Sequence, residues 1–205
     1  MAGKETENNE LDSPNTQEVY IVDKNEASLR LVSLYGSIEE ETIGDLCVDL
    51  LALKEIIKYS QTASNNDKTI DFIVSTYGGE ASEAFALYDI MRVVRKDCDI
   101  ATFGLGKVMS GGVLILAAGT KGKRKIGKNC RLMVHSVVGT SHGSLYSLEN
   151  EMEEVRWIQD RFINALAKET NMTVKYIKED LFGKKMNVYL SAEEAVELGI
   201  ADEII

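Results

Sequence analysis

The chain has 205 residues, 44% of them hydrophobic and 27% charged, a composition that suits one globular domain. Its 33 acidic residues outnumber the 23 basic ones and give a net charge of −10. This balance argues against nucleic acid or an anionic membrane surface as the main partner, because phosphate groups are bound by clustered Lys and Arg. The longest apolar run, from Val113 to Ala118, is far shorter than the ~18 residues that a membrane-spanning helix needs.

The cysteines and histidines bear on location and on metal binding. Cys47, Cys98 and Cys130 are odd in number and far apart, which is typical of reduced thiols in a cytoplasmic protein and not of a disulfide framework. The only two histidines are His135 and His142, and a zinc site would have to recruit scattered carboxylates. We therefore predict a cytoplasmic protein that holds neither a metal ion nor a cofactor.

Residues 1–17 are polar, contain the only proline and lack the apolar core of a secretory signal. We expect a flexible tail there, because so few apolar residues cannot offset the entropy lost on ordering. Residues 18–205 are expected to form the single domain.

Strand and helix patterns alternate through this domain. In chain order we expect a strand at Leu31 to Tyr35, a helix at Thr42 to Tyr59, a strand at Ile70 to Ser75, a helix at Ala81 to Arg95, a strand at Ile100 to Phe103, a short helix at Ser110 to Ala118, a strand at Leu132 to His135, a long helix at Ser147 to Thr170, a helix at Ala192 to Leu198 and a closing strand at Ala201 to Ile205. This alternation predicts an α/β fold with a largely parallel sheet, in which functional groups lie beyond the carboxyl ends of the strands.

Three of these strand ends carry candidate groups. Gly78 and Gly79 follow the strand at Ile70 to Ser75, and they indicate either an anion-binding backbone turn or a plain strand-to-helix turn. Ser110 ends a glycine-rich stretch that begins at Gly104, just where an apolar helix starts. Its hydroxyl is either an ordinary helix N-cap or a nucleophile at the positive end of the helix dipole.

His135 ends the third of these strands, and it is either a polar edge residue or a catalytic base. His142 lies in a polar loop and is expected to be exposed. A glycine pair, a serine at a helix start and a histidine at a strand end together supply an oxyanion site, a nucleophile and a base. That combination is what acyl transfer requires.

Four segments carry a resemblance to a known family. They are YGG with the following AFALYDIM between Tyr77 and Met91, GKVMSGGVLILAAGTKGKR at Gly106 to Arg124, RLMVH at Arg131 to His135, and LSAEEAVELGIAD at Leu190 to Asp202. The chain from about Leu31 to Ile205 resembles the Clp proteolytic-subunit (ClpP) family of serine peptidases. The resemblance implies a ClpP/crotonase-like βαβ spiral from which a helix-strand handle protrudes.

The resemblance also assigns roles. Ser110 would be the nucleophile and His135 the base, while the N–H groups of Gly78 and Gly111 would hold the oxyanion. Substrates would be unfolded polypeptides or short peptides, and the chains would form a homo-oligomer of stacked heptameric rings that a Clp-type ATPase can dock. The helix at Ser147 to Thr170 would be the handle, and Gly139 to Gly143 would belong to a strand region that pairs with substrate.

Three departures from the family pattern stand out. Asn187 occupies the position of the usual triad aspartate; an amide can orient imidazole but cannot offset imidazolium charge, and asparagine is also a common turn residue. Val137 replaces a proline that usually follows the histidine closely. The segment before Leu31 lacks the family's N-terminal pattern, which normally helps to dock the ATPase.

Two rival hypotheses follow. The first is a ring subunit that keeps the fold but has weak or no catalytic activity, as Asn187 suggests. The second is an acyl-CoA enzyme of the crotonase type, which shares the βαβ spiral and the paired oxyanion amides. Enzymes of that type do not need a serine and a histidine at positions 110 and 135.

Overall fold

A computed structural model describes residues 29–59, 68–183 and 186–205 of the chain. The predicted tail at 1–17 and nearly all of the polar loop between the first helix and second strand lie outside these residues. The described elements are β1 (Leu31–Ile38), α1 (Glu40–Tyr59), β2 (Thr69–Gly79), α2 (Ala81–Val94), β3 (Asp99–Met109), α3 (Gly111–Ala117), β4 (Lys125–Ile126), β5 (Arg131–Val134), α4 (Leu145–Glu169), α5 (Val174–Tyr176), the π-helical turn η1 (Ile177–Leu181), β6 (Val188–Leu190), α6 (Ala192–Glu197) and β7 (Glu203–Ile204).

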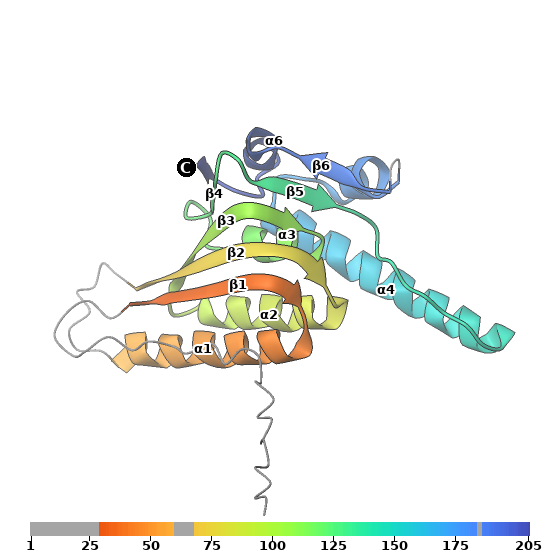
Figure 1. Cartoon of the computed structure of the whole chain (residues 1–205), viewed down its shortest axis with the longest axis horizontal. Helices are drawn as coiled ribbons and strands as arrows, with labels where there is room; N and C mark the ends of the chain where they lie inside the picture. Colours follow the sequence, from red (N-terminus) through yellow and green to blue (C-terminus); the bar gives the residue numbers. More distant parts are fainter. Residues whose placement is uncertain (1–28, 60–67, 184–185) are drawn as a thin grey trace, which may run out of the picture.

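The strands form one seven-stranded sheet whose main path runs β1-β2-β3-β4-β7 (Figure 1). β5 also pairs with β3, and all of these pairings are parallel. Only the short strand β6 is antiparallel to its neighbour, β5. The prediction of an α/β fold with a largely parallel sheet is therefore confirmed.

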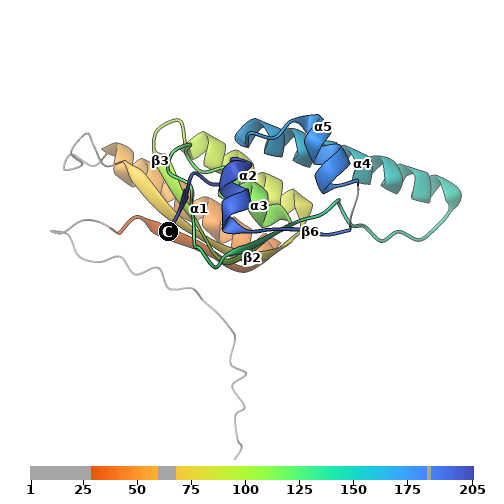
Figure 2. The same ribbon diagram turned by 90° about the horizontal axis from the view of Figure 1, so that it is seen from above.

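Helices α1, α2 and α3 lie together on one side of the curved sheet (Figure 2). Their apolar faces and the strands enclose the core, in which Phe72 of β2 and Leu87 of α2 are fully buried. Every residue of α3 is buried, which explains why this helix is apolar all round. The core therefore fixes α3 firmly against β2 and β3.

Helix α4 departs from this compact body. Its buried residues, Ile163, Leu166 and Glu169, all lie towards its carboxyl end. The amino-terminal half extends beyond the sheet in Figure 1 and forms the helical part of the expected handle. The segment Gly139 to Gly143, which the resemblance assigns to a strand region that pairs with substrate, is not a strand in the described structure. A strand needs a hydrogen-bonded neighbour, and here this segment has none among the described strands.

The largest boundary errors concern the glycine-rich segments. β2 runs through Gly79, so the glycine pair ends a strand and does not form a separate turn. β3 runs to Met109, so most of the stretch from Gly104 that was predicted as a loop is strand. Parallel neighbours on both sides of β3 supply hydrogen bonds that stabilise an extended backbone despite the glycines.

Candidate active site

Ser110 stands between the end of β3 and the start of α3. Its backbone N–H donates a hydrogen bond of 2.8 Å to the carbonyl of Met133, two residues before His135. Its own carbonyl accepts a bond of 3.0 Å from Val113 in the first turn of α3. The backbone of Ser110 therefore links the serine helix directly to the histidine strand β5.

The backbone of Ser110 is strained. Its φ of 54° and ψ of −125° make it the one non-glycine residue with a positive φ among those that the structure describes. Such a conformation costs on the order of 1–3 kcal/mol and is found most often at functional sites. Ser110 occupies the N-cap position of α3, but its side chain makes no cap hydrogen bond, so capping does not account for the serine hydroxyl here.

Gly78 lies directly against Ser110. A methyl group at Gly78, where φ is 95°, would come within 2.6 Å of Ser110 Cβ and 3.1 Å of Ser110 Oγ. Any side chain at this position would therefore displace the serine. The N–H of Gly78 donates a 2.9 Å hydrogen bond to Thr76 Oγ1, which in turn donates to the carbonyl of Gly36.

The predicted oxyanion donors differ in availability. Gly111 is the first residue of α3, where helix N–H groups have no partner inside the helix, and it lines the pocket described below. The Gly78 N–H is already used by Thr76. Gly79, and not Gly78, lines the pocket.

His135 follows β5 and is half-buried. Its Nδ1 lies 2.6 Å from the carbonyl oxygen of Ser136, and because a carbonyl can only accept, Nδ1 must carry the proton. In the neutral imidazole this contact leaves Nε2 as the acceptor nitrogen, which is the tautomer that a general base at Ser110 needs. No hydrogen bond joins His135 to Ser110 within the described part of the chain. His142 is exposed, as expected.

Asn187 directly precedes β6, which pairs with the strand that leads to His135. β5 and β6 pair with Val134 opposite Val188, so the same antiparallel register, continued by one residue, sets Asn187 opposite His135. The Asn187 side chain is exposed. It has no hydrogen bond to the imidazole in the described structure, where the Ser136 carbonyl holds Nδ1.

A pocket of about 580 Å³ opens over these residues. Ser110, Gly111 and His135 line it together, with Tyr77 and Gly79 from the end of β2. Its apolar wall comes from Ala84 of α2, from Val137 and Val138 after β5, and from Ile158 and Phe162 of α4. The volume suits a substrate side chain. The structure thus brings together three of the predicted site residues and leaves Gly78 and Asn187 just outside.

One of the family departures, at Val137, has a structural consequence here. Val137 has the N–H that a proline would lack, and it donates a 3.3 Å bond to Gln159 Oε1, which ties the segment after His135 to α4. Tyr77, near the end of β2, also borders the pocket; it is 65% exposed and carries Lys107 Nζ at 4.6 Å from its ring centre.

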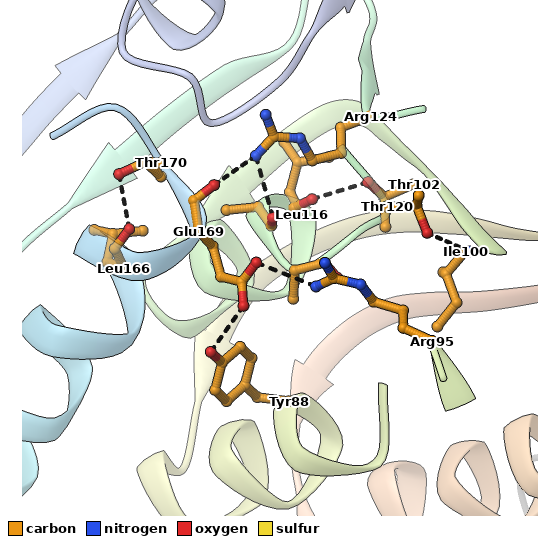
Figure 3. Close-up of polar contacts among 12 residues, drawn as sticks. Tyr88, Arg95, Ile100, Thr102, Leu116, Thr120, Arg124, Leu166, Glu169 and Thr170 are labelled. Atoms are coloured by element: carbon orange, nitrogen blue, oxygen red, sulfur yellow. Dashed lines mark hydrogen bonds and ion pairs between the residues drawn. The ribbon is translucent and has the colours of Figure 1, made fainter. Parts of the chain in front are cut away.

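Buried donors also fix the carboxyl end of α3 (Figure 3). The carbonyl of Leu116 accepts from Thr102 Oγ1 at 2.8 Å, and that of Ala118 accepts from Arg95 Nη1 at 2.8 Å. Arg124 Nη1 donates to Ala117 at 3.3 Å. These groups satisfy the free helix carbonyls, and the two cations complement the negative end of the helix dipole. They hold α3, and with it Ser110, in place along the helix axis.

The same cluster holds the end of α4. The buried Glu169 carboxylate accepts hydrogen bonds from Tyr88 OH at 2.9 Å and from Arg95 Nη1 at 3.1 Å (Figure 3). The backbone carbonyl of Glu169 accepts a third hydrogen bond, from Arg124 Nη1 at 2.7 Å. Burial, together with the Glu169 carboxylate, raises the pKa of Tyr88 to about 12. Arg124 is paired in turn with Asp202. The base of the handle and the serine helix therefore share one polar cluster.

Sequence reasoning missed the backbone carbonyls of Met133 and Ser136 and the cluster around Glu169. Carbonyl partners leave no signal in residue type, so no pattern identifies them. Arg124 and Asp202 lie inside the segments that carried the family resemblance, but nothing in their spacing indicates that they pair.

The described residues also bear on metal binding and on membrane insertion. Its residues contain no group of three His, Cys, Asp or Glu side chains that could hold a metal ion. No helix among them is both long and apolar enough to cross a bilayer. Cys47, Cys98 and Cys130 are free thiols.

A strained serine that faces a pocket with a histidine, at the carboxyl edge of a parallel sheet, is the geometry of an α/β serine hydrolase. Comparison with known proteins narrows the class: the family model described as Clp protease matches residues 15–205. The chain belongs to the Clp protease family, and membership implies serine peptidase activity. The match starts well before Leu31, so it includes part of the segment in which the sequence showed no family pattern. It favours the peptidase over the acyl-CoA hypothesis.

Proposed function

We propose that this chain is a serine endopeptidase subunit in which Ser110 is the nucleophile and His135 the general base. The observation that supports this most is the strained backbone of Ser110, because a φ of 54° at a non-glycine residue is costly and gives no cap hydrogen bond in return. The pocket that Ser110 shares with His135 supports the same roles.

The reaction would be acyl transfer. Ser110 Oγ attacks the peptide carbonyl while His135 Nε2 takes its proton, and the protonated imidazole then gives that proton to the leaving amine. Water hydrolyses the ester by the same route. The Ser136 carbonyl keeps the imidazole in the required tautomer through its 2.6 Å contact with Nδ1.

The oxyanion would be held by the Gly111 N–H and by a donor from the end of β2. We predicted Gly78 for the second role, and a rotation of Thr76 Oγ1 away from its N–H would free that donor. Gly79 is the alternative, because it lines the pocket. Each such donor contributes on the order of 10²–10³ in rate.

Clp proteases generally form oligomeric rings and cleave polypeptides. For this chain we propose a homo-oligomer of stacked heptameric rings whose chamber admits unfolded polypeptides or short peptides, with α4 as the handle between rings. Exposed apolar side chains on α4, among them Leu145, Tyr146, Met152 and Trp157, support such a contact. Docking of a Clp-type ATPase and a cytoplasmic location remain predictions from the sequence.

The test is peptide hydrolysis by size-fractionated protein. Activity should coincide with the oligomeric fraction and disappear in Ser110→Ala, which should elute as the wild type does. Turnover by Ser110→Ala at the wild-type rate would exclude Ser110 as the nucleophile.

A second candidate function is a ring subunit with weak catalysis. It is favoured by Asn187, which is exposed and has no hydrogen bond to His135 in the described structure. A protein that forms the ring but neither hydrolyses peptides nor reacts with a fluorophosphonate would support this alternative.

A further inference from the structure

Two glutamates stand side by side at the mouth of the pocket that holds Ser110. Glu39 directly follows Ile38, the last residue of β1, and Glu80 directly follows Gly79, the last residue of β2. Ile38 and Gly79 are paired in the β1–β2 register, and the Glu80 N–H donates a 2.9 Å hydrogen bond to the Ile38 carbonyl. Both glutamates are exposed and both line the pocket.

Helix stability alone accounts for only part of this arrangement. Each glutamate precedes a helix, α1 or α2, whose amino end carries about half a positive charge and so stabilises a carboxylate. However, the Glu80 side chain makes no cap hydrogen bond. Neither Glu39 nor Glu80 has an ion pair in the described part of the chain. Two carboxylates against two helix ends leave a net charge of about −1 at the mouth.

Cations do not cancel this charge within the pocket. No Lys or Arg is among the described residues that line it, and its one imidazole is that of His135. Lys107 packs on the ring of Tyr77 at the rim, 4.6 Å from the ring centre, but does not itself line the pocket. The Lys107 charge weakens the negative potential at the rim, but no cation of the pocket lining neutralises Glu39 and Glu80.

The apolar wall and the acidic mouth together match one kind of side chain. Ala84, Val137, Ile158 and Phe162 present an apolar surface that suits methylene groups. A lysine or arginine side chain can lay its aliphatic stem along such a wall and keep its charged end at exposed carboxylates. A glutamate or aspartate side chain would meet repulsion at the same place.

We propose that Glu39 and Glu80 make this peptidase selective for polypeptides with a Lys or Arg side chain beside the scissile bond. The inference rests on the proposed function, because it takes this pocket as the one that receives substrate. It adds two specificity-determining residues that take no part in the chemistry of Ser110 and His135.

The effect should be modest and salt-dependent. Exposed charge pairs are weak, so each carboxylate should change relative kcat/KM by about threefold to tenfold. Salt near 0.5 M shortens the screening length to a few ångströms and should remove most of the preference.

The experiment uses quenched fluorescent peptides that differ only in Lys, Gln or Glu beside the cleaved bond. The order of kcat/KM should be Lys, then Gln, then Glu. Glu80→Gln and Glu39→Gln should each lower the Lys-to-Glu ratio, and the double variant should bring it close to one. Glu40→Gln and Glu83→Gln are matched controls, since neither residue lines the pocket, and they should keep the wild-type ratio.

A binding measurement distinguishes failure of the proposed selectivity from failure of the proposed peptidase activity. The same peptides are titrated into Ser110→Ala protein, and binding is followed by fluorescence anisotropy. Cleavage without charge preference, or a preference that survives the double variant, would overturn the inference and leave the peptidase intact. Tighter binding of the Lys peptide without any turnover by wild type would overturn the proposed activity and keep the selective pocket. Equal binding of all three peptides would also overturn the selectivity.

Discussion

The strain at Ser110 gives a test that concerns stability and not only activity. Ser110→Ala keeps the costly positive φ, whereas Ser110→Gly relieves it, because glycine adopts φ near 54° freely. Glycine also gains entropy in the unfolded chain. We expect Ser110→Gly to be more stable than Ser110→Ala by about 1 kcal/mol in chemical denaturation, while both lack activity. An alanine variant as stable as the glycine one would mean that the backbone stores no strain.

The two histidines should differ sharply. His135→Ala should lower kcat/KM by about 10³-fold or more, because nucleophile and base act as a unit. His142→Ala should have a mild effect, since His142 is exposed and does not line the pocket. Steady-state rates of peptide hydrolysis by the two variants show which histidine is the general base. If His135→Ala were harmless and His142→Ala damaging, the general base would be His142 and not His135.

Asn187 can be tested through its position opposite His135. Asn187→Asp would place a carboxylate across from the imidazole and stabilise the imidazolium that forms during attack. We expect it to raise the acylation rate at neutral pH by roughly tenfold. Asn187→Ala should lower the rate only slightly, because the Ser136 carbonyl already holds Nδ1. Single-turnover acylation measures both, and wild-type rates in both variants would exclude Asn187 from the chemistry.

At the scale of elements, the polar cluster at the carboxyl ends of α3 and α4 makes the folding stability fall at high pH. Burial and Glu169 raise the pKa of Tyr88 from its ordinary 10 to about 12, so the folded state holds the Tyr88 proton more tightly than the unfolded state. This contribution is complete below pH 10 and is lost as the pH rises towards 12.

Tyr88→Phe removes that contribution. Because other groups also titrate at high pH, the informative quantity is the difference between wild type and variant. We expect the difference in unfolding free energy to shrink by on the order of 1–2 kcal/mol between pH 9 and 11.5, measured by urea denaturation. A difference that stays constant over this range would show that burial and Glu169 do not raise the pKa of Tyr88 in the folded state.

Sequence patterns predicted most elements because their apolar periodicities are strong, as in α1, α2 and α4. The element ends were less predictable. Glycines suggested a loop after Phe103, but pairing with strands from distant parts of the chain keeps β3 extended to Met109. Short strands such as β4 and β6 owe their existence to their neighbours and not to their own residues. Ser110 and His135 were predictable because each combines a reactive side chain with a strand end, whereas the carbonyls that orient them carry no sequence signal.

For the whole molecule, assembly is the main prediction. Trp157 of α4 is 52% exposed and carries Arg161 at 4.9 Å from its ring centre, so it does not pack into its own domain. We expect Trp157→Glu, which puts a charge into the proposed contact, to shift the protein to smaller species in analytical ultracentrifugation at micromolar concentration. Lys175→Glu, an exposed change on α5, is the control. A wild-type protein that sediments as a monomer would contradict the ring proposal.

Covalent labelling tests whether Ser110 is a nucleophile that His135 activates. The protein is treated with a fluorophosphonate, and the adduct is located by peptide mass spectrometry. We expect one adduct, on Ser110, that forms far more slowly in His135→Ala and at an unchanged rate in His142→Ala. No adduct on Ser110 in assembled wild-type protein, or an adduct that forms as fast without His135, would contradict it.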